Sequence, residues 1–166
     1  MMEGVRLLFV CMGNICRSPT AEAVMRDLVA REGLEGEIVI DSAGTGGWHV
    51  GSPPDERSTA AAKARGIVME GAARQVTAAD FDDYDLLLAA DRENVGALRA
   101  LAPDAEVAAK IRLLREFDEV SARAGDLAIP DPYYGGPSGF EDVLDLVDAA
   151  CRGLLETLRA EGRVGG

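Results

Sequence analysis

A strand, a loop and a helix follow one another near the start of the chain, and this order constrains the fold more than any other feature. Residues 6–10 (Arg-Leu-Leu-Phe-Val), which are apolar after Arg6, predict a short buried strand. Ser18-Pro19 then supplies a helix N-cap residue and a proline suited to the first turn, and apolar residues follow at helical spacing. Residues 38–40 predict a second strand. This sequence of elements predicts a βαβ unit in a parallel sheet.

The rest of the chain continues the alternation of strands and helices. Residues 84–89 and 111–114 predict two further strands, and residues 118–137 predict a long loop. A final helix is predicted at about residues 140–159, where apolar side chains recur at helical spacing. Cys151 belongs to that apolar stripe, so we interpret it as a buried core residue.

Alternating strands and helices in a chain of 166 residues indicate a three-layer α/β fold, with residues 1–166 forming one domain. In such sheets, ligands bind where the carboxyl ends of strands meet the N-termini of helices. For this chain, that rule points to residues 11–18, which join the first strand to the first helix.

The charge balance bears on possible partners. Acidic residues outnumber basic ones by 29 to 17, giving a net charge of −12, which argues against a nucleic-acid partner. The longest apolar runs are too short to span a bilayer, and no signal-peptide pattern is present. We therefore expect a cytoplasmic protein with no membrane association.

Three cysteines, Cys11, Cys16 and Cys151, do not indicate a disulfide framework. A structural zinc site needs four Cys or His ligands in paired short spacings, and His49 is the single histidine. We therefore expect no metal and no cofactor. His49 is interpreted as a loop histidine and not as a catalytic base.

The loop at residues 11–18 has the composition of an anion site. Cys11 ends the first strand, and Arg17 follows six residues later at the mouth of the helix. Gly13 permits a positive φ and Asn14 tolerates one, so the backbone N–H groups of the loop can converge on an anion. Arg17 can then hold two oxygens of a phosphate group bidentately.

The same features activate Cys11 as a nucleophile. A helix N-terminus and the charge of Arg17 favour thiolate over thiol, and Ser18 can donate a hydrogen bond to the sulfur. The thiolate would attack phosphorus and form a phosphoenzyme, while the loop amides and Arg17 hold the equatorial oxygens. The alternative is a buried cysteine beside a helix-capping arginine. The position of the motif between a buried strand and Ser-Pro favours the catalytic interpretation.

Asp131 is a candidate general acid. It lies between two prolines that restrict its backbone, and two tyrosines follow closely. Adjacent aromatic rings would exclude water and keep the carboxyl group protonated, as an acid catalyst requires. A turn aspartate with no catalytic role is equally compatible with these residues alone.

The loop and several other stretches together resemble one known family. Residues 9–23 (Phe-Val-Cys-Met-Gly-Asn-Ile-Cys-Arg-Ser-Pro-Thr-Ala-Glu-Ala) are similar throughout to the low-molecular-weight protein tyrosine phosphatases. The resemblance continues in order over essentially the whole chain, at Asp41-Ser-Ala-Gly44, Pro53-Pro-Asp55, Ala73-Arg-Gln75, Asp91 with Asn94, and Asp131-Pro-Tyr-Tyr-Gly135.

The resemblance implies a Rossmann-like, four-stranded parallel sheet with helices on both faces. It implies that phosphotyrosine-containing proteins or aryl phosphates are the substrates and that inorganic phosphate is a product. Cys11 is then the nucleophile, Arg17 the phosphate clamp, and Asp131 the acid that protonates the leaving phenolate and later the base for water. The other implied site residues are the phosphate loop (Met12, Gly13, Asn14, Ile15, Cys16, Ser18), the entrance walls (Trp48, Tyr133, Tyr134) and Ser42, which with Asn14 and Ser18 holds the loop.

The chain departs from the family at one position. The family commonly has a histidine two residues before Ala-Arg-Gln, in support of the loop network, and here that position is Gly71. We expect either a looser network or a water molecule in place of the imidazole.

Three other functions are compatible with parts of this pattern. A thiol-relay arsenate reductase shares the fold and loop but needs further cysteines, and residues 81–94 contain none. A protein-arginine phosphatase is similar to family members with Thr in place of Ile15. A non-enzymatic redox sensor would use Cys11 and Cys16 and would not need Asp131. A nucleotide-binding domain is disfavoured, because no Gly-rich stretch completes a dinucleotide or Walker pattern.

Overall fold

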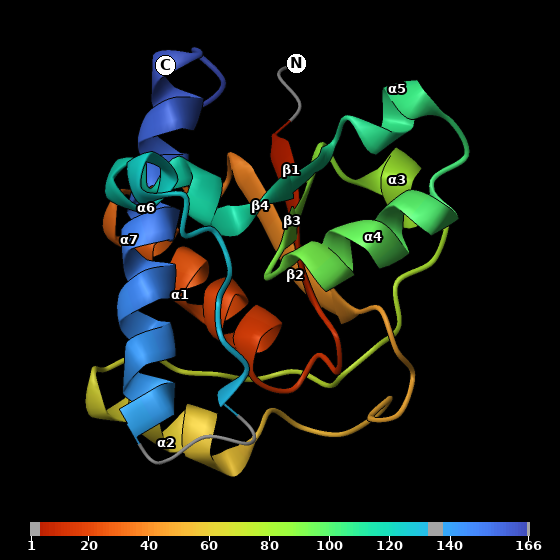
Figure 1. Ribbon diagram of the computed structural model, residues 1–166. Helices are drawn as coiled ribbons and strands as arrows, with labels where there is room; N and C mark the ends of the chain where they lie inside the picture. Colours follow the sequence, from red (N-terminus) through yellow and green to blue (C-terminus); the bar gives the residue numbers. More distant parts are fainter. Residues whose placement is uncertain (1–3, 133–137, 166) are drawn as a thin grey trace.

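A four-stranded parallel sheet forms the centre of the computed structural model, which describes residues 4–132 and 138–165 (Figure 1). The strand order is β2-β1-β3-β4, so β1 lies inside the sheet. The predicted strands and the predicted parallel sheet are confirmed. The strands are β1 (Val5–Cys11), β2 (Ile38–Gly44), β3 (Leu86–Ala89) and β4 (Ile111–Leu113).

Helices cover both faces of the sheet, which confirms the predicted three-layer architecture. They are α1 (Arg17–Arg31), α2 (Glu56–Ala64), α3 (Asp80–Asp83), α4 (Arg92–Leu101), α5 (Ala105–Ala108), the 3-10 helix η1 (Leu114–Phe117), α6 (Glu119–Ala124) and α7 (Ser138–Ala160). Figure 1 shows α1 and α7 on one side of the sheet, and α3, α4 and α5 on the other.

Alternate residues of β1 explain why both faces are covered. Leu7 and Phe9 belong to a buried cluster that includes the apolar faces of α1 and α7. Leu8 and Val10 point to the opposite face and pack in a second cluster that includes Phe81 of α3. A strand that is buried on both faces appears as a continuous apolar run, as residues 7–10 do.

Two features of the predicted secondary structure are wrong. The first helix begins at Arg17, and Ser18 does not cap it, because its hydroxyl group contacts residues of the preceding loop instead. Within the predicted loop at 118–137, residues Glu119–Ala124 form α6, which is capped by Asp118 and ends at Gly125 with a φ of 71°.

The final helix agrees closely with its predicted limits, and Cys151 within it is fully buried, as predicted. Among the described residues, no helix is both long enough and apolar enough to cross a membrane.

The topology determines where a ligand site can form. Because the strands are parallel, β1, β2 and β3 all end at the same edge of the sheet, at Cys11, Gly44 and Ala89. Helix α1 starts at that edge, six residues after Cys11, so its N-terminus faces the ends of the strands.

Candidate active site

The loop between β1 and α1 has an unusual backbone at one residue. Asn14 has a φ of 57° and is the single non-glycine residue with a positive φ in the described part of the chain. Asparagine tolerates this left-handed conformation better than most residues. The loop also pairs with the chain that follows β2, because Thr45 N–H donates to the Cys11 carbonyl and Gly46 N–H to the Met12 carbonyl, both at 2.9 Å.

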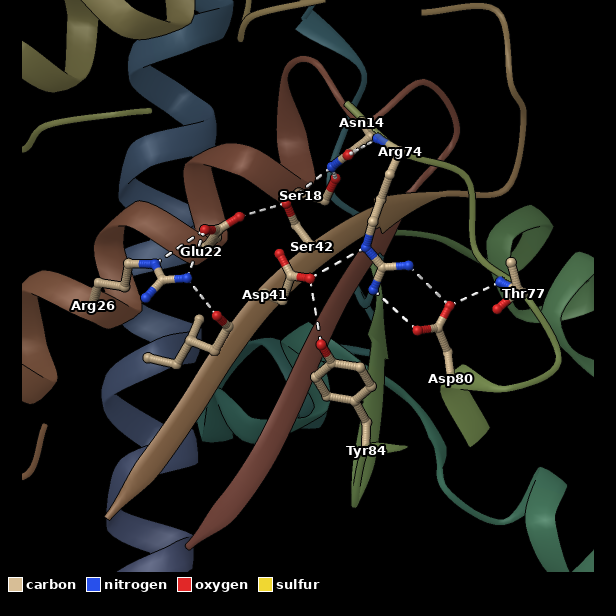
Figure 2. A network of polar contacts seen from close by, with 11 residues as sticks. Asn14, Ser18, Glu22, Arg26, Asp41, Ser42, Arg74, Thr77, Asp80 and Tyr84 are labelled. Carbon is tan, nitrogen blue, oxygen red and sulfur yellow. Dashed lines mark hydrogen bonds and ion pairs between the residues drawn. The ribbon is translucent and has the colours of Figure 1, made fainter. Parts of the chain in front are cut away.

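A hydrogen-bond network behind the loop fixes the direction of the Asn14 side chain (Figure 2). The backbone N–H of Arg74 donates to Asn14 Oδ1 at 3.0 Å, so the amide nitrogen must face the other way. That nitrogen donates to Ser18 Oγ at 2.8 Å and to Ser42 Oγ at 3.0 Å. Ser42 in turn donates to a carboxylate oxygen of Glu22 at 2.6 Å.

The direction of this network leaves a hydrogen-bond donor for Cys11. The Ser18 hydroxyl accepts from Asn14, so its hydrogen can point at Cys11 Sγ, 2.9 Å away. The backbone N–H of Asn14 also donates to that sulfur, at 3.3 Å. Two donors on one sulfur atom stabilise a thiolate and orient it.

Arg74 supports the network through its own side chain, which Figure 2 shows between two carboxylates. Its guanidinium group makes two hydrogen bonds with buried Asp80, at 3.1 and 3.0 Å, and one with Asp41 at 3.2 Å. Burial lowers the pKa of Arg74, but the bonds and charges of these carboxylates outweigh it and raise the pKa above its usual value.

Gly71 lies beside this network and leaves space there. It has a φ of +100°, and a cavity of about 60 Å³ lies between it, Asn14, Glu22 and Ser42. A polar cavity of this size can hold a water molecule. The Ser42 hydroxyl nevertheless has an acceptor for its hydrogen without such a water molecule, because it donates to the Glu22 carboxylate.

Arg17 lines the same pocket as Cys11 and is buried, with 5% of its surface exposed. Its Nη1 donates to Asp91 at 2.6 Å and to the Ile129 carbonyl at 3.0 Å, and its Nη2 lies 3.9 Å from Asp131. Burial alone would lower the pKa of Arg17. The hydrogen bond to Asp91 and the charges of Cys11, Asp91 and Asp131 raise it above its usual value.

Asp91 is itself held firmly, because it is the N-cap of α4. Its side chain accepts from the backbone N–H of Asn94 at 2.8 Å, and the Asn94 side chain accepts from the Asp91 N–H at 3.2 Å. The guanidinium group of Arg17 is therefore oriented before any ligand binds, which reduces the ordering cost of binding.

A pocket of about 470 Å³ opens above Cys11, which is within the usual size range for a small-molecule site. Two glycines, which have no side chain, leave room for the aromatic rings of two residues in the pocket wall. A side chain on Gly46 would overlap the ring of Trp48, and one on Gly13 would begin 3.0 Å from Cδ2 of His49. The lining residues are Cys11, Met12, Gly13, Ile15, Cys16, Arg17, Trp48, His49 and Asp131.

The two other cysteines differ from Cys11 in their surroundings. Cys16 lines the pocket but is 4% exposed, and burial raises the pKa of its thiol to about 12. Burial also raises the pKa of Cys151 above its usual value. Both side chains are therefore neutral thiols at neutral pH.

The structure brings most of the sequence-predicted site residues together. All those predicted to bind phosphate line the pocket except Asn14 and Ser18, which form the supporting network with Ser42. Tyr133 and Tyr134 lie outside the described residues. Sequence reasoning did not assign His49 or Asp91 to the site. Two sequence features could have identified them: His49 is adjacent to Trp48, and Asp91 comes just after a buried strand.

The fold and the site together define a class. A buried strand ends in a cysteine, a loop curls back to place a hydroxyl and an amide on its sulfur, and an arginine at the start of the next helix lies beside it. Such an arrangement can hold a phosphate group next to a sulfur atom that is able to act as a nucleophile. It is the site of a cysteine-dependent phosphatase.

Comparison with known proteins identifies the family within that class. The family model for low molecular weight phosphotyrosine protein phosphatases matches residues 6–164. A low molecular weight protein-tyrosine-phosphatase from Streptomyces coelicolor is 51% identical over 160 residues, which cover 95% of this chain and 97% of that protein. This chain belongs to the low molecular weight phosphotyrosine protein phosphatase family, and it is an enzyme that hydrolyses phosphotyrosine.

Solved structures agree with this assignment. A protein tyrosine phosphatase from Entamoeba histolytica superposes with a TM-score of 0.89 at 37% identity, covering 97% of this chain and 100% of that one. A Drosophila arginine phosphatase superposes with a TM-score of 0.85 at 33% identity, covering 92% of this chain and 97% of that one.

Proposed function

We propose that Cys11 is the nucleophile that takes the phosphoryl group from phosphotyrosine or an aryl phosphate. The observation that carries this proposal is the pair of donors, Ser18 Oγ at 2.9 Å and Asn14 N–H at 3.3 Å, on a sulfur atom that lines the pocket. Sulfur attacks phosphorus, the bond from phosphorus to the phenolic oxygen breaks, and a phosphocysteine forms.

Arg17 and Asp131 complete the reaction. The Nε and Nη2 groups of Arg17 donate hydrogen bonds to oxygens of the phosphoryl group during its transfer. Its Nη1 stays hydrogen-bonded to Asp91 and to the Ile129 carbonyl. Asp131 gives a proton to the leaving phenolate. It then accepts a proton from the water that attacks phosphorus, which breaks the bond from sulfur to phosphorus and releases inorganic phosphate.

The physiological substrates in this proposal are phosphotyrosine-containing proteins. Trp48, which is 75% exposed at the pocket, offers an aromatic surface to a flat phenyl ring. Ile15 presents a branched apolar surface at the pocket, which does not hydrogen-bond a guanidinium group.

Protein-arginine phosphatase activity is the second candidate, because a solved arginine phosphatase shares the fold at a TM-score of 0.85. We expect kcat/KM for a phosphotyrosine peptide to exceed that for phosphoarginine and phosphoserine peptides of the same sequence. A seryl phosphate is too short to reach Cys11 at the base of the pocket. Steady-state kinetics on the three peptides measure this preference. Equal kcat/KM for phosphoarginine and phosphotyrosine would contradict the proposed substrate class.

We also propose that Cys16 protects Cys11 from irreversible oxidation. Both cysteines line the same pocket. Peroxide converts the Cys11 thiolate to sulfenic acid, and Cys16 then displaces water to form a disulfide, which a thiol reductant reverses. Because Cys16 is a neutral thiol with a pKa near 12, this second step is slower than it would be for a free cysteine.

Mild peroxide is therefore expected to inactivate the enzyme reversibly and to produce a peptide in which Cys11 is linked to Cys16. The Cys16→Ser variant should regain much less activity after reduction, because its sulfenic acid proceeds to sulfinic acid. Activity recovery and peptide mass spectrometry measure both effects. Recovery by Cys16→Ser as complete as in the wild type, with no linked peptide from the wild type, would exclude this role.

The remaining proposals concern the whole chain. We propose that residues 1–166 act as a single phosphatase domain, since both buried clusters pack on one sheet. A cytoplasmic location is proposed because a reducing compartment keeps the Cys11 sulfur reduced, as the reaction requires.

A further inference from the structure

The segment that carries Asp131 follows α6 and contains no regular secondary structure up to that residue. Ile129 joins it to the site, because its N–H donates to the Ala90 carbonyl at 2.8 Å and its carbonyl accepts from Arg17 at 3.0 Å. Ile129 is also buried, whereas Pro130 after it is exposed. The position of Asp131 depends on how this segment is held.

Arg115 of η1 provides a second anchor one residue earlier. Its Nη1 donates to the Ala128 carbonyl. The same guanidinium group lies 3.0 Å from the Asp126 carboxylate and donates to Ser121 Oγ at 3.0 Å. Ser121 has its own hydroxyl hydrogen committed to Asp118, at 2.6 Å, so it acts as an acceptor towards Arg115.

Packing alone does not explain an arginine at this position. Arg115 is 5% exposed, and its Nε is buried without a hydrogen-bond partner among the residues that the structure describes. An unsatisfied buried donor lowers stability, and a methionine could occupy similar space without it. What the guanidinium group adds is a hydrogen bond that fixes one carbonyl of the segment, the Ala128 carbonyl.

We propose that Arg115 is a positioning residue for proton transfer by Asp131. Two arginines hold successive carbonyls of the segment, Arg115 at Ala128 and Arg17 at Ile129. Both anchors precede Pro130, whose ring fixes φ, so a displacement at Ala128 is passed on to the carboxyl group. This inference rests on the proposed role of Asp131 as the general acid.

The physical consequence is specific to one step. A general acid must lie within hydrogen-bond reach of the oxygen that it protonates, and a displacement of about 1 Å can reduce the rate about 10²-fold. A displaced Asp131 matters most for a leaving group that needs a proton. It matters little for nitrophenolate, which leaves without one. Within the described residues, the hydrogen bonds of Arg115 go to Ala128, Ser121 and Asp126 and not to the phosphate loop, so phosphate affinity should not change.

The test is the dependence of kcat/KM on the leaving group, because this constant reports cleavage of the bond to the phenol. We expect Arg115→Met to lose about 10²-fold with phenyl phosphate and to be nearly unchanged with p-nitrophenyl phosphate. Arg115→Lys, which keeps one donor for the carbonyl, should fall between. Asp131→Asn should show the same steepened dependence, with a loss of about 10²–10⁴-fold for the poor leaving group.

Matched controls separate positioning from stability. Arg123→Met removes an exposed arginine of neighbouring α6, paired with Glu119 at 2.8 Å, and should leave the leaving-group dependence as in the wild type. Circular dichroism and the affinity for inorganic phosphate check that each variant is folded with an intact loop. If Arg115→Met does not fold, the same measurements are made on Arg115→Lys and on Asp126→Ala. Asp126 is suitable because it is largely exposed and pairs with Arg115.

The outcomes distinguish this inference from the proposed function. A uniform loss across the series in Asp131→Asn would remove the acid role and this inference with it. A steepened dependence in Asp131→Asn, together with a wild-type slope or a uniform loss in the folded Arg115 variants, would overturn the positioning role alone. A steepened dependence in both would support both.

Discussion

Replacing Cys11 by serine is expected to abolish turnover while leaving phosphate binding intact. A serine hydroxyl is a far weaker nucleophile than a thiolate, and no base lies next to Cys11 in the proposed mechanism to activate it. We expect kcat to fall on the order of 10⁶-fold, the size of the loss when an essential nucleophile is removed from a hydrolase. The groups that hold phosphate remain, because the Asn14 network and Arg17 are unchanged.

The measurement is hydrolysis of p-nitrophenyl phosphate alongside calorimetric titration with inorganic phosphate. Cys151→Ala is the matched control, since that cysteine is buried in α7 away from the pocket lining. It should retain kcat even if it lowers the free energy of unfolding. Clear hydrolysis by Cys11→Ser would show that the nucleophile is another group.

With p-nitrophenyl phosphate, whose leaving group does not need the proton of Asp131, replacing Arg17 by lysine has the second largest expected effect. Lysine keeps the positive charge but offers a single ammonium group in place of a planar fork. It cannot hold Asp91, the Ile129 carbonyl and two phosphate oxygens at once, as the arginine geometry allows. We expect kcat to fall about 10²–10³-fold, the cost of losing one well-placed donor to a developing charge, and phosphate affinity to fall with it.

Arg31→Lys is the control for this variant, because Arg31 lies on the same helix and forms an exposed pair with Asp27 at 3.0 Å. It should behave as the wild type in steady-state kinetics and phosphate titration. Retention of most of the wild-type kcat by Arg17→Lys would mean that charge alone suffices and that the bidentate grip is not required.

The secondary structure was predictable where burial dominates and less so where side chains act across the fold. Residues 7–10 form an apolar run because β1 is covered on both faces, so the local sequence alone indicates that this strand is buried. Ser18 follows local capping rules in sequence, but its hydroxyl is used by Cys11 and Asn14. Helix α6 was missed because it is short and Ser121 is its one buried residue, so no apolar stripe marks it.

The site residues also divide into those that the local sequence indicates and those that depend on contacts across the fold. The loop from Cys11 to Arg17 is contiguous, so its spacing alone indicated an anion site. The partner of Arg17 is Asp91, 74 residues away, and the residue that orients Asn14 is Arg74, 60 residues away. Many arginines and carboxylates in this acidic chain could pair, and only the order of the strands determines which of them meet.

The contacts of Arg17 and Asn14 tie the pocket to the global stability of the fold. Segments after β1, β2 and β3, together with the one before Asp131, must all be in place before the pocket exists. The unfolded chain therefore has no site, and any compound that fills the pocket binds the native state alone. Occupancy at 100 times the Kd would add about 2.7 kcal/mol to the free energy of unfolding. Ligands of this pocket can thus be found by the rise in thermal midpoint that they cause, both in the wild type and in the Cys11→Ser variant, whose expected loss of turnover rules out an activity assay.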